Sequence, residues 1–440
     1  MSNNKPQAKG IALLPILIFV VLYLGLGILF EYVMGISMGF YNIPIILIFL
    51  IAIFVAVMQT RGKTKDINEI MSIMGEGAGD GNIMTMLIIF LLAGAFVGVV
   101  GRSSAESVAY FILSIIPPQF AVAVLLLVSF LVSLAMGTSV GTITLIAPIA
   151  VATSDASGFS LPICLGAVIG GAMFGDNLSF ISDTTIAACN GQGVPMKAKF
   201  KENFAIALPA AIVAMVITII ISLNTYDGGA VAGEYNLIQT IPYILVLVCG
   251  IAGVNVFLDL IIGIVSGAII MVATGAVAAT DLLANMGSGI SGMFETCMVA
   301  VLVAALCALV RVNGGFEALL NWIRKRFKGQ KGGQLGIGLL VSAMDIATAN
   351  NTVAIVMANP IAKEISDEYG IRPEKTASLL DTFSCILQGL LPYGAQMLVA
   401  ISACAELGKD ISAFQILPFM FYPFFLLLSS LVFIFIIKKK

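Results

Sequence analysis

Long apolar segments separated by short polar stretches recur along the chain, and their length is the first feature that predicts a structure. A helix rises about 1.5 Å per residue, so about 20 apolar residues cross the hydrocarbon core of a bilayer. Segments of this kind lie at 11–31, 41–60, 82–101, 119–136, 203–223, 256–275, 293–310 and 412–437. Shorter or interrupted apolar segments lie at 138–153, 161–190, 239–254, 333–365 and 373–405. The pattern predicts an all-α polytopic membrane protein whose partner is the lipid bilayer.

Basic residues gather in some connecting segments and are absent from others, which predicts an orientation. They cluster at Lys5/Lys9, Arg61/Lys63/Lys65, Lys197/Lys199/Lys201, Arg324 to Lys331 and Lys438–Lys440. The segments 224–238 and 276–292 contain no Lys or Arg. Because cytoplasmic loops carry the excess of Lys and Arg, both termini are expected in the cytoplasm and the chain in the inner (cytoplasmic) membrane.

A repeat with an offset of 212 residues runs through the chain. Three motifs recur at this offset, which are Met74-Gly75-x-Gly77, Pro148-Ile149-Ala150 and Ser154-Asp155-x-x-Gly158; their second copies begin at Met286, Pro360 and Ser366. The loop after the second span is basic, whereas its counterpart at 276–292 has no base, so the halves are expected in opposite orientations. Inverted repeats build secondary transporters, with broken helices or re-entrant hairpins meeting near the bilayer midplane.

The repeat predicts the domain organisation. A cytoplasmic tail (1–10) precedes the N-terminal repeat (11–223). An external connecting loop (224–238) leads to the C-terminal inverted repeat (239–437), and a basic cytoplasmic tail (438–440) follows.

The amino-acid composition excludes several classes of function. The chain is 60% hydrophobic and 10% charged with a net charge of −2, so there is no dense basic face for a nucleic acid. Histidine is absent, which excludes imidazole metal sites and Ser/His or Cys/His catalysis, and leaves proton chemistry to Asp and Glu. The seven cysteines form no CxxC pair and are expected to be buried small hydrophobes. No GxxxxGK[ST] motif is present. We therefore expect neither an enzyme nor an ATP-driven pump, and no cofactor beyond a transported or coupling Na⁺ or H⁺.

The most polar stretch inside apolar sequence is FGDNLSFISDTT at 174–185. A charged side chain at the bilayer centre costs at least about 2.5–3.5 kcal/mol, so this cluster is expected to line a polar cavity or an ion path. Its hard oxygen donors are Asp176, Asn177, Ser179, Ser182, Asp183 and Thr184. Na⁺ is expected at Asp176, Asn177, Ser182 and Asp183, and a carboxylate could take a proton instead. Asp345 and Asp381 are the next cation or proton candidates. The structural alternative is a hydrogen-bonded acid that fixes helix packing.

Three further polar clusters predict broken helices. They lie at 137–144 ahead of Pro148, at 345–352 ahead of Pro360, and at 381–396. Gly, Ser and Thr favour a break in a membrane helix, and the N-termini of half-helices suit a carboxylate. The breaks at 138–142 and 348–352 are expected to meet near 176–183. The solute-binding candidates are Ser139, Thr142, Asn350, Asn351, Thr352, Gln388, Tyr393 and Gln396. For the residues at 350–352 interhelical hydrogen bonding is the alternative.

Other acids in apolar surroundings are expected at the membrane interface rather than in a site. These are Glu76, Asp80, Asp259, Asp281 and Glu295.

The run at 174–185 resembles the signature GDxxSPxSDTT of the NhaC-type sodium/proton antiporter family of the ion transporter superfamily, with Phe180 in place of the usual proline. The second half is similar to one branch of that family, whose members are proposed to be amino-acid permeases. The similar segments are TANNTVAI (348–355), NPIAKEI (359–365), ASLLDTFSC (377–385) and QGLLPYGAQ (388–396). The resemblance covers essentially the whole chain. It implies a homodimer in which one domain of each subunit is a scaffold and the other carries the site.

The leading hypothesis is a Na⁺- or H⁺-coupled carrier of a small amphiphilic solute, an amino acid above all, that works by alternating access. The neutral donors and acceptors exceed what a bare cation needs, because a zwitterion requires both kinds and Na⁺ requires acceptors alone. The alternative is a Na⁺/H⁺ antiporter without organic substrate, and a channel or structural protein is a third reading.

Overall fold

The computed structural model describes residues 7–36, 43–62, 66–180, 182–226, 234–252 and 254–436, and the regular structure in these ranges is helical throughout. Nine helices in these ranges are long and apolar enough to cross a membrane, or ten if one bent pair of helices counts as a span. The prediction of an all-α polytopic membrane protein is confirmed.

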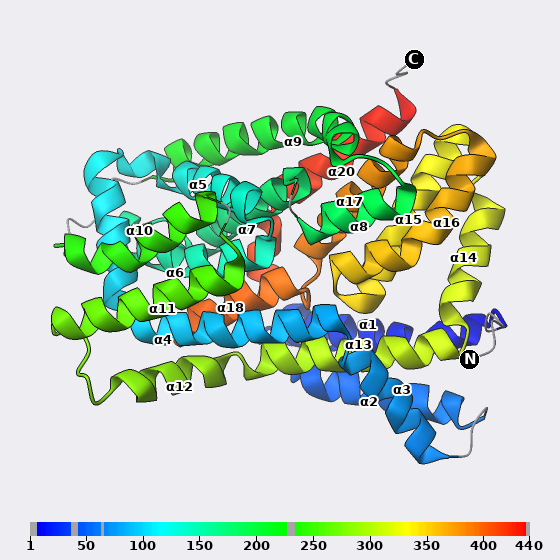
Figure 1. Cartoon of the computed structure of the whole chain (residues 1–440), viewed down its shortest axis with the longest axis horizontal. Helices are drawn as coiled ribbons and strands as arrows, with labels where there is room; N and C mark the ends of the chain where they lie inside the picture. The colour runs from blue at the N-terminus through cyan, green and yellow to red at the C-terminus, as the bar shows by residue number, and fades with distance from the viewer. Residues whose placement is uncertain are drawn as a thin grey trace.

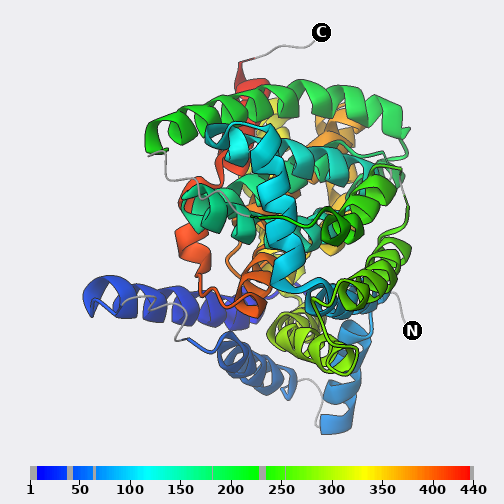
Figure 2. The same cartoon turned by 90° about the vertical axis from the view of Figure 1, so that its left-hand side faces the viewer.

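The helices form a bundle with two outer layers (Figures 1 and 2). On one face lies α9 (Met196–Thr225), and on the opposite face lie α1 (Leu14–Ile28) and α2 (Ile45–Thr60). Between these layers lie two sets of four helices. The first set is α5 (Ala121–Met136), α6 (Ser139–Ser157), α7 (Leu161–Leu178) and α8 (Asp183–Gln192). The second set is α15 (Gly329–Thr348), α16 (Asn351–Tyr369), α17 (Pro373–Leu390) and α18 (Ala395–Glu406).

The remaining helices pack around this centre. They are α3 (Ile67–Ala78), α4 (Gly81–Ile115, kinked at Gly101), α10 (Leu237–Ile251), α11 (Val256–Ala273), α12 (Leu282–Gly292), α13 (Phe294–Val312), α14 (Gly315–Arg326), α19 (Ala413–Ile416) and α20 (Phe421–Phe435).

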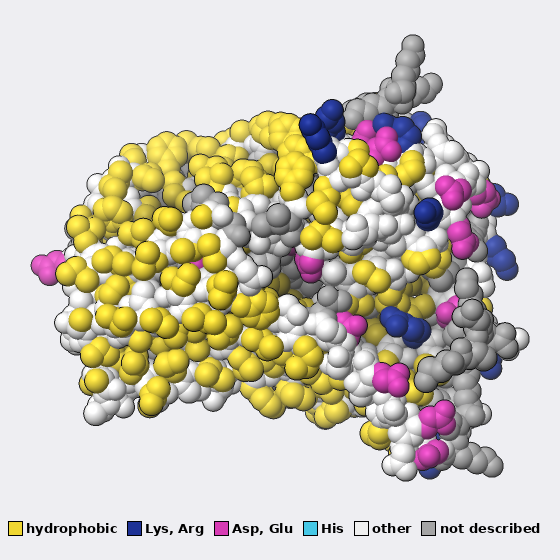
Figure 3. Space-filling model, in the orientation of Figure 1, with side chains coloured by type: hydrophobic (Ala, Val, Ile, Leu, Met, Phe, Trp, Pro, Cys, Tyr) yellow, Lys and Arg dark blue, Asp and Glu magenta, His cyan; other side chains and the backbone are white. Residues whose placement is uncertain are grey.

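The surface separates apolar from charged side chains along the long axis. In Figure 3 hydrophobic side chains cover most of the visible face, whereas acidic and basic side chains gather at the right-hand end. On α9 the side chains of Ile212, Val216 and Ile220 are about half exposed, as expected for a surface in contact with lipid. The start of α1 and the end of α20 lie at the charged end of the molecule (Figure 1), and the cytoplasmic placement of both termini stays a prediction.

The internal repeat is present in the structure as well as in the sequence. Helices α6 and α16 differ by 212 residues at both ends, and so do α7 and α17. The turns between them also match, because the Ser154 hydroxyl donates to Phe159 O at 2.7 Å and the equivalent Ser366 hydroxyl donates to Ile371 O at 2.7 Å. The opposite membrane orientation of the halves and the domain bounds given above stay predictions.

The predicted helix breaks at 138–142 and 348–352 are confirmed. Gly137 adopts a left-handed conformation (φ 70°) between α5 and α6, and Ala349 does so (φ 47°) between α15 and α16. The next residue caps the following helix in each repeat. The N–H of Gly141 donates to Thr138 Oγ1 at 3.3 Å, and the N–H of Val353 donates to Asn350 Oδ1 at 2.9 Å. Side-chain acceptors thus satisfy N–H groups that a broken membrane helix leaves without a backbone partner.

Several predictions about the spans need correction. Helices α3 and α12 were not expected, because they are 12 and 11 residues long and too short to cross a bilayer. The segment 412–437 is not one straight span, since Ala413–Phe419 and Phe421–Phe435 meet at an angle of 53°. Asp259, expected at the membrane interface, is fully buried on α11, which packs against α4 and α10.

Glycine substitutions in α3 and α12 provide a matched stability test. A methyl group on Gly77 would lie 2.7 Å from Ala304 O, and one on Gly289 would overlap Gly94 O, whereas Gly75 and Gly287 have nothing within 4 Å. We predict that Gly77→Ala and Gly289→Ala each destabilise the fold by about 1–3 kcal/mol through overpacking. Gly75→Ala and Gly287→Ala are the controls and should leave stability unchanged or slightly higher. Thermal denaturation in detergent measures this, and equal melting of all four variants would contradict the packing.

Candidate functional site

Asp176 lies where the first helix break meets the end of α7. Its Oδ2 accepts a hydrogen bond from the Ser139 hydroxyl at 2.7 Å, and its Oδ1 accepts one from the Ser182 hydroxyl at 2.6 Å. Ser139 begins α6, and Ser182 immediately precedes α8. The carboxylate therefore joins the N-terminal ends of two half-helices, whose partial positive charge stabilises it. Asp176 is 4% exposed.

Asp183, the first residue of α8, is bound by the other repeat. Its Oδ2 accepts from the Thr352 hydroxyl at 2.6 Å, and its Oδ1 accepts from the N–H of Thr184 at 3.0 Å. Thr352 lies in the first turn of α16, directly after the second break. The expectation that the two breaks meet near 176–183 is thereby confirmed, since one break supplies a hydroxyl to each acid.

Both carboxylates line a cavity of about 80 Å³, which we call the central cavity. A single water needs roughly 10–15 Å³ of such space, so the cavity has room for several waters or a partly hydrated cation. None of the described residues that line it is basic. The lining polar residues are Thr85, Thr138, Ser139, Asp176, Asp183, Asn350, Asn351, Thr352, Gln388 and Gln396.

Two glutamines connect the second break to Asp176. Gln388 Nε2 donates to Ala349 O at 3.0 Å and to Gln396 Oε1 at 2.8 Å. Gln396 Nε2 in turn donates to the Ser139 hydroxyl at 3.0 Å, and that hydroxyl donates to Asp176. A continuous chain of hydrogen bonds therefore links the second break to the acid.

The structure leaves several predicted site residues outside the central cavity. The Thr142 hydroxyl donates to Thr138 O within its own helix, and the Tyr393 hydroxyl donates to Ile346 O. Thr184 bonds to the Ser182 hydroxyl at 2.8 Å, behind Asp176, and Ser179 is buried. Asp345 is fully buried on α15, and within the described ranges neither of its oxygens has a hydrogen-bond partner.

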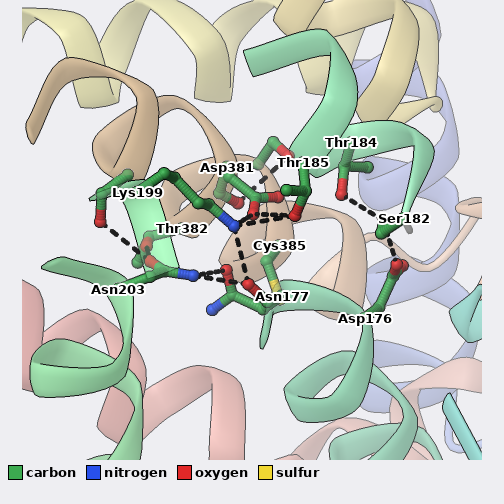
Figure 4. A network of polar contacts seen from close by, with 12 residues as sticks. Asp176, Asn177, Ser182, Thr184, Thr185, Lys199, Asn203, Asp381, Thr382 and Cys385 are labelled. Atoms are coloured by element: carbon green, nitrogen blue, oxygen red, sulfur yellow. Dashed lines mark hydrogen bonds and ion pairs between the residues drawn. The ribbon is translucent and has the colours of Figure 1, made fainter. Parts of the chain in front are cut away.

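Asn177 and Asp381, two predicted cation ligands, belong to a second polar network beside the cavity (Figure 4). Lys199 is 1% exposed, and its ammonium forms an ion pair with Asp381. The same ammonium donates to Thr185 Oγ1 and to Asn177 O, each at 2.9 Å. All three donors of the ammonium group thus have acceptors, which compensates for the cost of burying the charge.

Asn203, one turn after Lys199 on α9, holds the end of α7. Its amide donates to both Asn177 O and Asn177 Oδ1 at 2.6 Å, and its own oxygen accepts from Ser378 and Thr382 of α17. The Asn177 amide donates to the Tyr422 hydroxyl at 3.1 Å. The side chain of Asn177 therefore points away from Asp176 and fixes the helix end on which Asp176 lies.

Sequence reasoning missed this network because it assigned Lys199 to a basic cytoplasmic loop, an assignment that is wrong. Helix α9 begins at Met196 rather than near 203, so Lys199 lies within a helix. A signal was present in the spacing, since Lys199 and Asn203 share a helical face with the buried residues Ile206, Ala210 and Ala214. Lys197 and Lys201, on the other faces, are exposed as expected.

The buried ion pair gives a sharp mutational prediction. Lys199→Met leaves Asp381 buried without a counter-charge, which we expect to destabilise the fold by about 3–5 kcal/mol. The double variant Lys199→Met/Asp381→Asn should recover much of that loss. Lys197→Met and Lys201→Met, at exposed positions of the same helix, are the controls and should melt like the wild type. Thermal denaturation in detergent makes the comparison, and a stable single variant would contradict the proposed structural role.

Comparison with known proteins supplies the family. The Na⁺/H⁺ antiporter family matches residues 4–225 and 230–437. The chain is 21% identical over 433 residues to the malate-2H⁺/Na⁺-lactate antiporter of Bacillus subtilis, covering 91% of this chain and 90% of that protein. It is 23% identical over 404 residues to the Na⁺/H⁺ antiporter NhaC of the same organism, covering 83% and 87%.

A third relative is the arginine/ornithine antiporter ArcD of Halobacterium salinarum, 22% identical over 382 residues, covering 79% of this chain and 76% of that protein. These relatives are antiporters with different substrates. The family match extends over nearly the whole sequence and includes both helix breaks and both acids of the central cavity. The chain belongs to the Na⁺/H⁺ antiporter family.

Proposed function

We propose that this secondary transporter couples Na⁺ or H⁺ to the movement of a small amphiphilic solute, an amino acid, by alternating access. The observation that carries the proposal is the central cavity, in which two carboxylates and four amide side chains face one space. Family membership supports secondary transport, and the nine or ten apolar helices of the described ranges support a multi-pass membrane protein.

The two acids are the proposed cation site. Asp176 and Asp183 line the same cavity of about 80 Å³, and no basic side chain among the described lining residues balances them. Two negative charges inside a membrane protein require protons or a bound cation, because an uncompensated charge is costly there. Na⁺ and H⁺ would therefore compete for these carboxylates, and competition of this kind couples the two ions.

The amides are the proposed solute site. Asn350, Asn351, Gln388 and Gln396 offer N–H donors as well as oxygen acceptors, whereas a bare cation uses acceptors alone. Relatives of the chain are named as antiporters of malate and lactate or of arginine and ornithine, which supports an organic solute. We further propose that the protein works as a homodimer in the inner membrane, as the family resemblance implies.

Na⁺/H⁺ exchange without organic substrate is the second candidate, and the small volume of the central cavity favours it. Purified protein in liposomes separates the two candidates. The exchanger moves Na⁺ against a pH gradient with no organic solute present, and its melting temperature rises with Na⁺ alone. The solute carrier shows uptake or thermal stabilisation with an amino acid.

We predict that Asp176→Asn or Asp183→Asn abolishes coupled transport while the melting temperature stays close to that of the wild type. Asparagine keeps the size and one of the two hydrogen-bond acceptors but removes the charge that a coupling cation neutralises. Asp367→Asn, at an exposed position of α16, is the control and should transport normally. Na⁺-dependent uptake at wild-type rates in both cavity variants would place the cation site elsewhere.

The solute site has its own test. Asn351→Ala removes an amide that lines the cavity but leaves both carboxylates in place. A neutral hydrogen bond is worth about 0.5–1.5 kcal/mol, so we predict a rise of up to about tenfold in KM for the organic solute. Na⁺ affinity should change less than in Asp176→Asn. An unchanged KM for the organic solute would exclude Asn351 from its recognition.

A further inference from the structure

A second and larger cavity lies between α3, α13 and the second helix break. Its volume is about 310 Å³, which falls at the lower end of the range for small-molecule sites. Its charged lining residues are Glu76 from the last turn of α3, Asp80 from the connection between α3 and α4, and Arg311 from the last turn of α13. We call it the vestibule. Glu76 and Asp80 were expected at the membrane interface rather than in a site, and Arg311 lies outside the central cavity.

The vestibule leads toward the central cavity. It shares Ile83 and Thr348 with a narrow passage of about 10 Å³, and that passage shares Met86 and Asn350 with the central cavity. A single water needs roughly 10–15 Å³ of such space, so the passage is closed to any larger solute. The contact between Asn350 Nδ2 and Met86 Sδ, at 2.7 Å, crosses the region shared by passage and central cavity. A solute that enters the vestibule is therefore held one barrier away from the cation site.

The charges of the vestibule match one class of solute. Within the described part of the chain neither Glu76 nor Arg311 forms an ion pair, so the guanidinium and this carboxylate remain free for a ligand. A guanidinium binds a carboxylate through two parallel hydrogen bonds. Carboxylates accept from an ammonium group. Two acids and one base fit a solute with one carboxylate and at least one ammonium group, and they repel a dicarboxylate.

We propose that the vestibule is a loading site for amino acids, in which Arg311 binds the α-carboxylate and Glu76 binds the ammonium group. This inference rests on the proposed amino-acid transport and adds a recognition site outside the central cavity. The ends of α3 and α13 that form it lie toward the charged end of the molecule (Figures 1 and 3). The positive-inside rule assigns that end to the cytoplasm, so loading occurs from the cytoplasmic side.

The test compares amino acids with the amines that lack their carboxylate. Titration calorimetry on purified protein in detergent, which exposes both sides, measures arginine against agmatine, ornithine against putrescine, and alanine against ethylamine. For each amino acid that the wild type binds, Arg311→Gln should weaken binding by about tenfold or more, as loss of a hydrogen bond to a charged group predicts. Binding of the matching amine should not weaken, because the amine has no carboxylate for Arg311 to bind. Arg311→Lys keeps the positive charge but lacks the two parallel N–H donors of the guanidinium, and it should recover part of the affinity.

A second pair of variants addresses the acids. Glu76→Gln should weaken the binding of the amino acid and of its amine alike, because both ligands carry the ammonium group. Glu69→Gln, on the same helix but outside the vestibule, and Arg61→Gln, at the end of α2, are the controls and should bind as the wild type does.

The outcomes separate this inference from the proposed function. If the wild type binds an amino acid and Arg311→Gln binds it equally well, the vestibule assignment is overturned while amino-acid transport stands. If the wild type binds no amino acid yet exchanges Na⁺ for H⁺ in liposomes, both proposals fall. Melting temperatures of all variants exclude misfolding as the cause of weaker binding. A variant that does not fold is replaced by a more conservative one, Arg311→Lys or Glu76→Asp, for which the expected loss of affinity is smaller.

Discussion

The buried ion pair between Lys199 and Asp381 is the constraint on which the arrangement of the site depends. It joins α9 to α17, and the same ammonium binds α8 through Thr185 and the end of α7 through Asn177 O. Four helices therefore share one charge in a region with little water, where removing either partner would leave a costly unpaired ion. Because α7 ends and α8 begins at this point, the ion pair also fixes the gap between them, and Asp176 and Asp183 flank that gap.

The two repeats share a backbone pattern but divide the chemistry unequally. At the 212-residue offset Asp176 corresponds to Gln388 and Asp183 to Ala395, so the first repeat supplies the acids of the central cavity and the second supplies amides. The second repeat also contributes Asp381, whose counterpart in the first repeat is Ile169. The cation chemistry proposed here thus belongs to one half, and the solute chemistry largely to the other. The fold is symmetric, whereas the site is not.

Local sequence signals predicted the broken helices and the acidic pair but not the network that supports them. The breaks at Gly137 and Ala349 were predictable because Thr138 and Asn350 are good capping residues beside hydroxyl- and amide-rich runs. The ion pair of Lys199 was not, because its partner Asp381 is 182 residues away, and the helical spacing that separates Lys199 from Lys197 and Lys201 becomes visible only once α9 is known to begin at Met196. The direction in which Asn177 points depends on Asn203 and Tyr422, and the vestibule depends on how α3 and α13 pack. Such long-range contacts have no local signature.

The constant offset of the repeat has a consequence for how this protein tolerates change over evolution. From Gly137 and Ala349 to the starts of α8 and α18, every helix boundary keeps the spacing of 212 residues. Elsewhere the spacing drifts, since α2 and α11 begin 211 residues apart and α4 and α13 begin 213 apart. Between the segment from α6 to the start of α8 and its counterpart from α16 to the start of α18 many side chains differ, whereas the number of residues between the helix boundaries does not. The number of residues in these segments is therefore the property that the two repeats have kept. A new substrate can arise by exchanging side chains, whereas a single inserted residue would shift the end of one half-helix relative to the other.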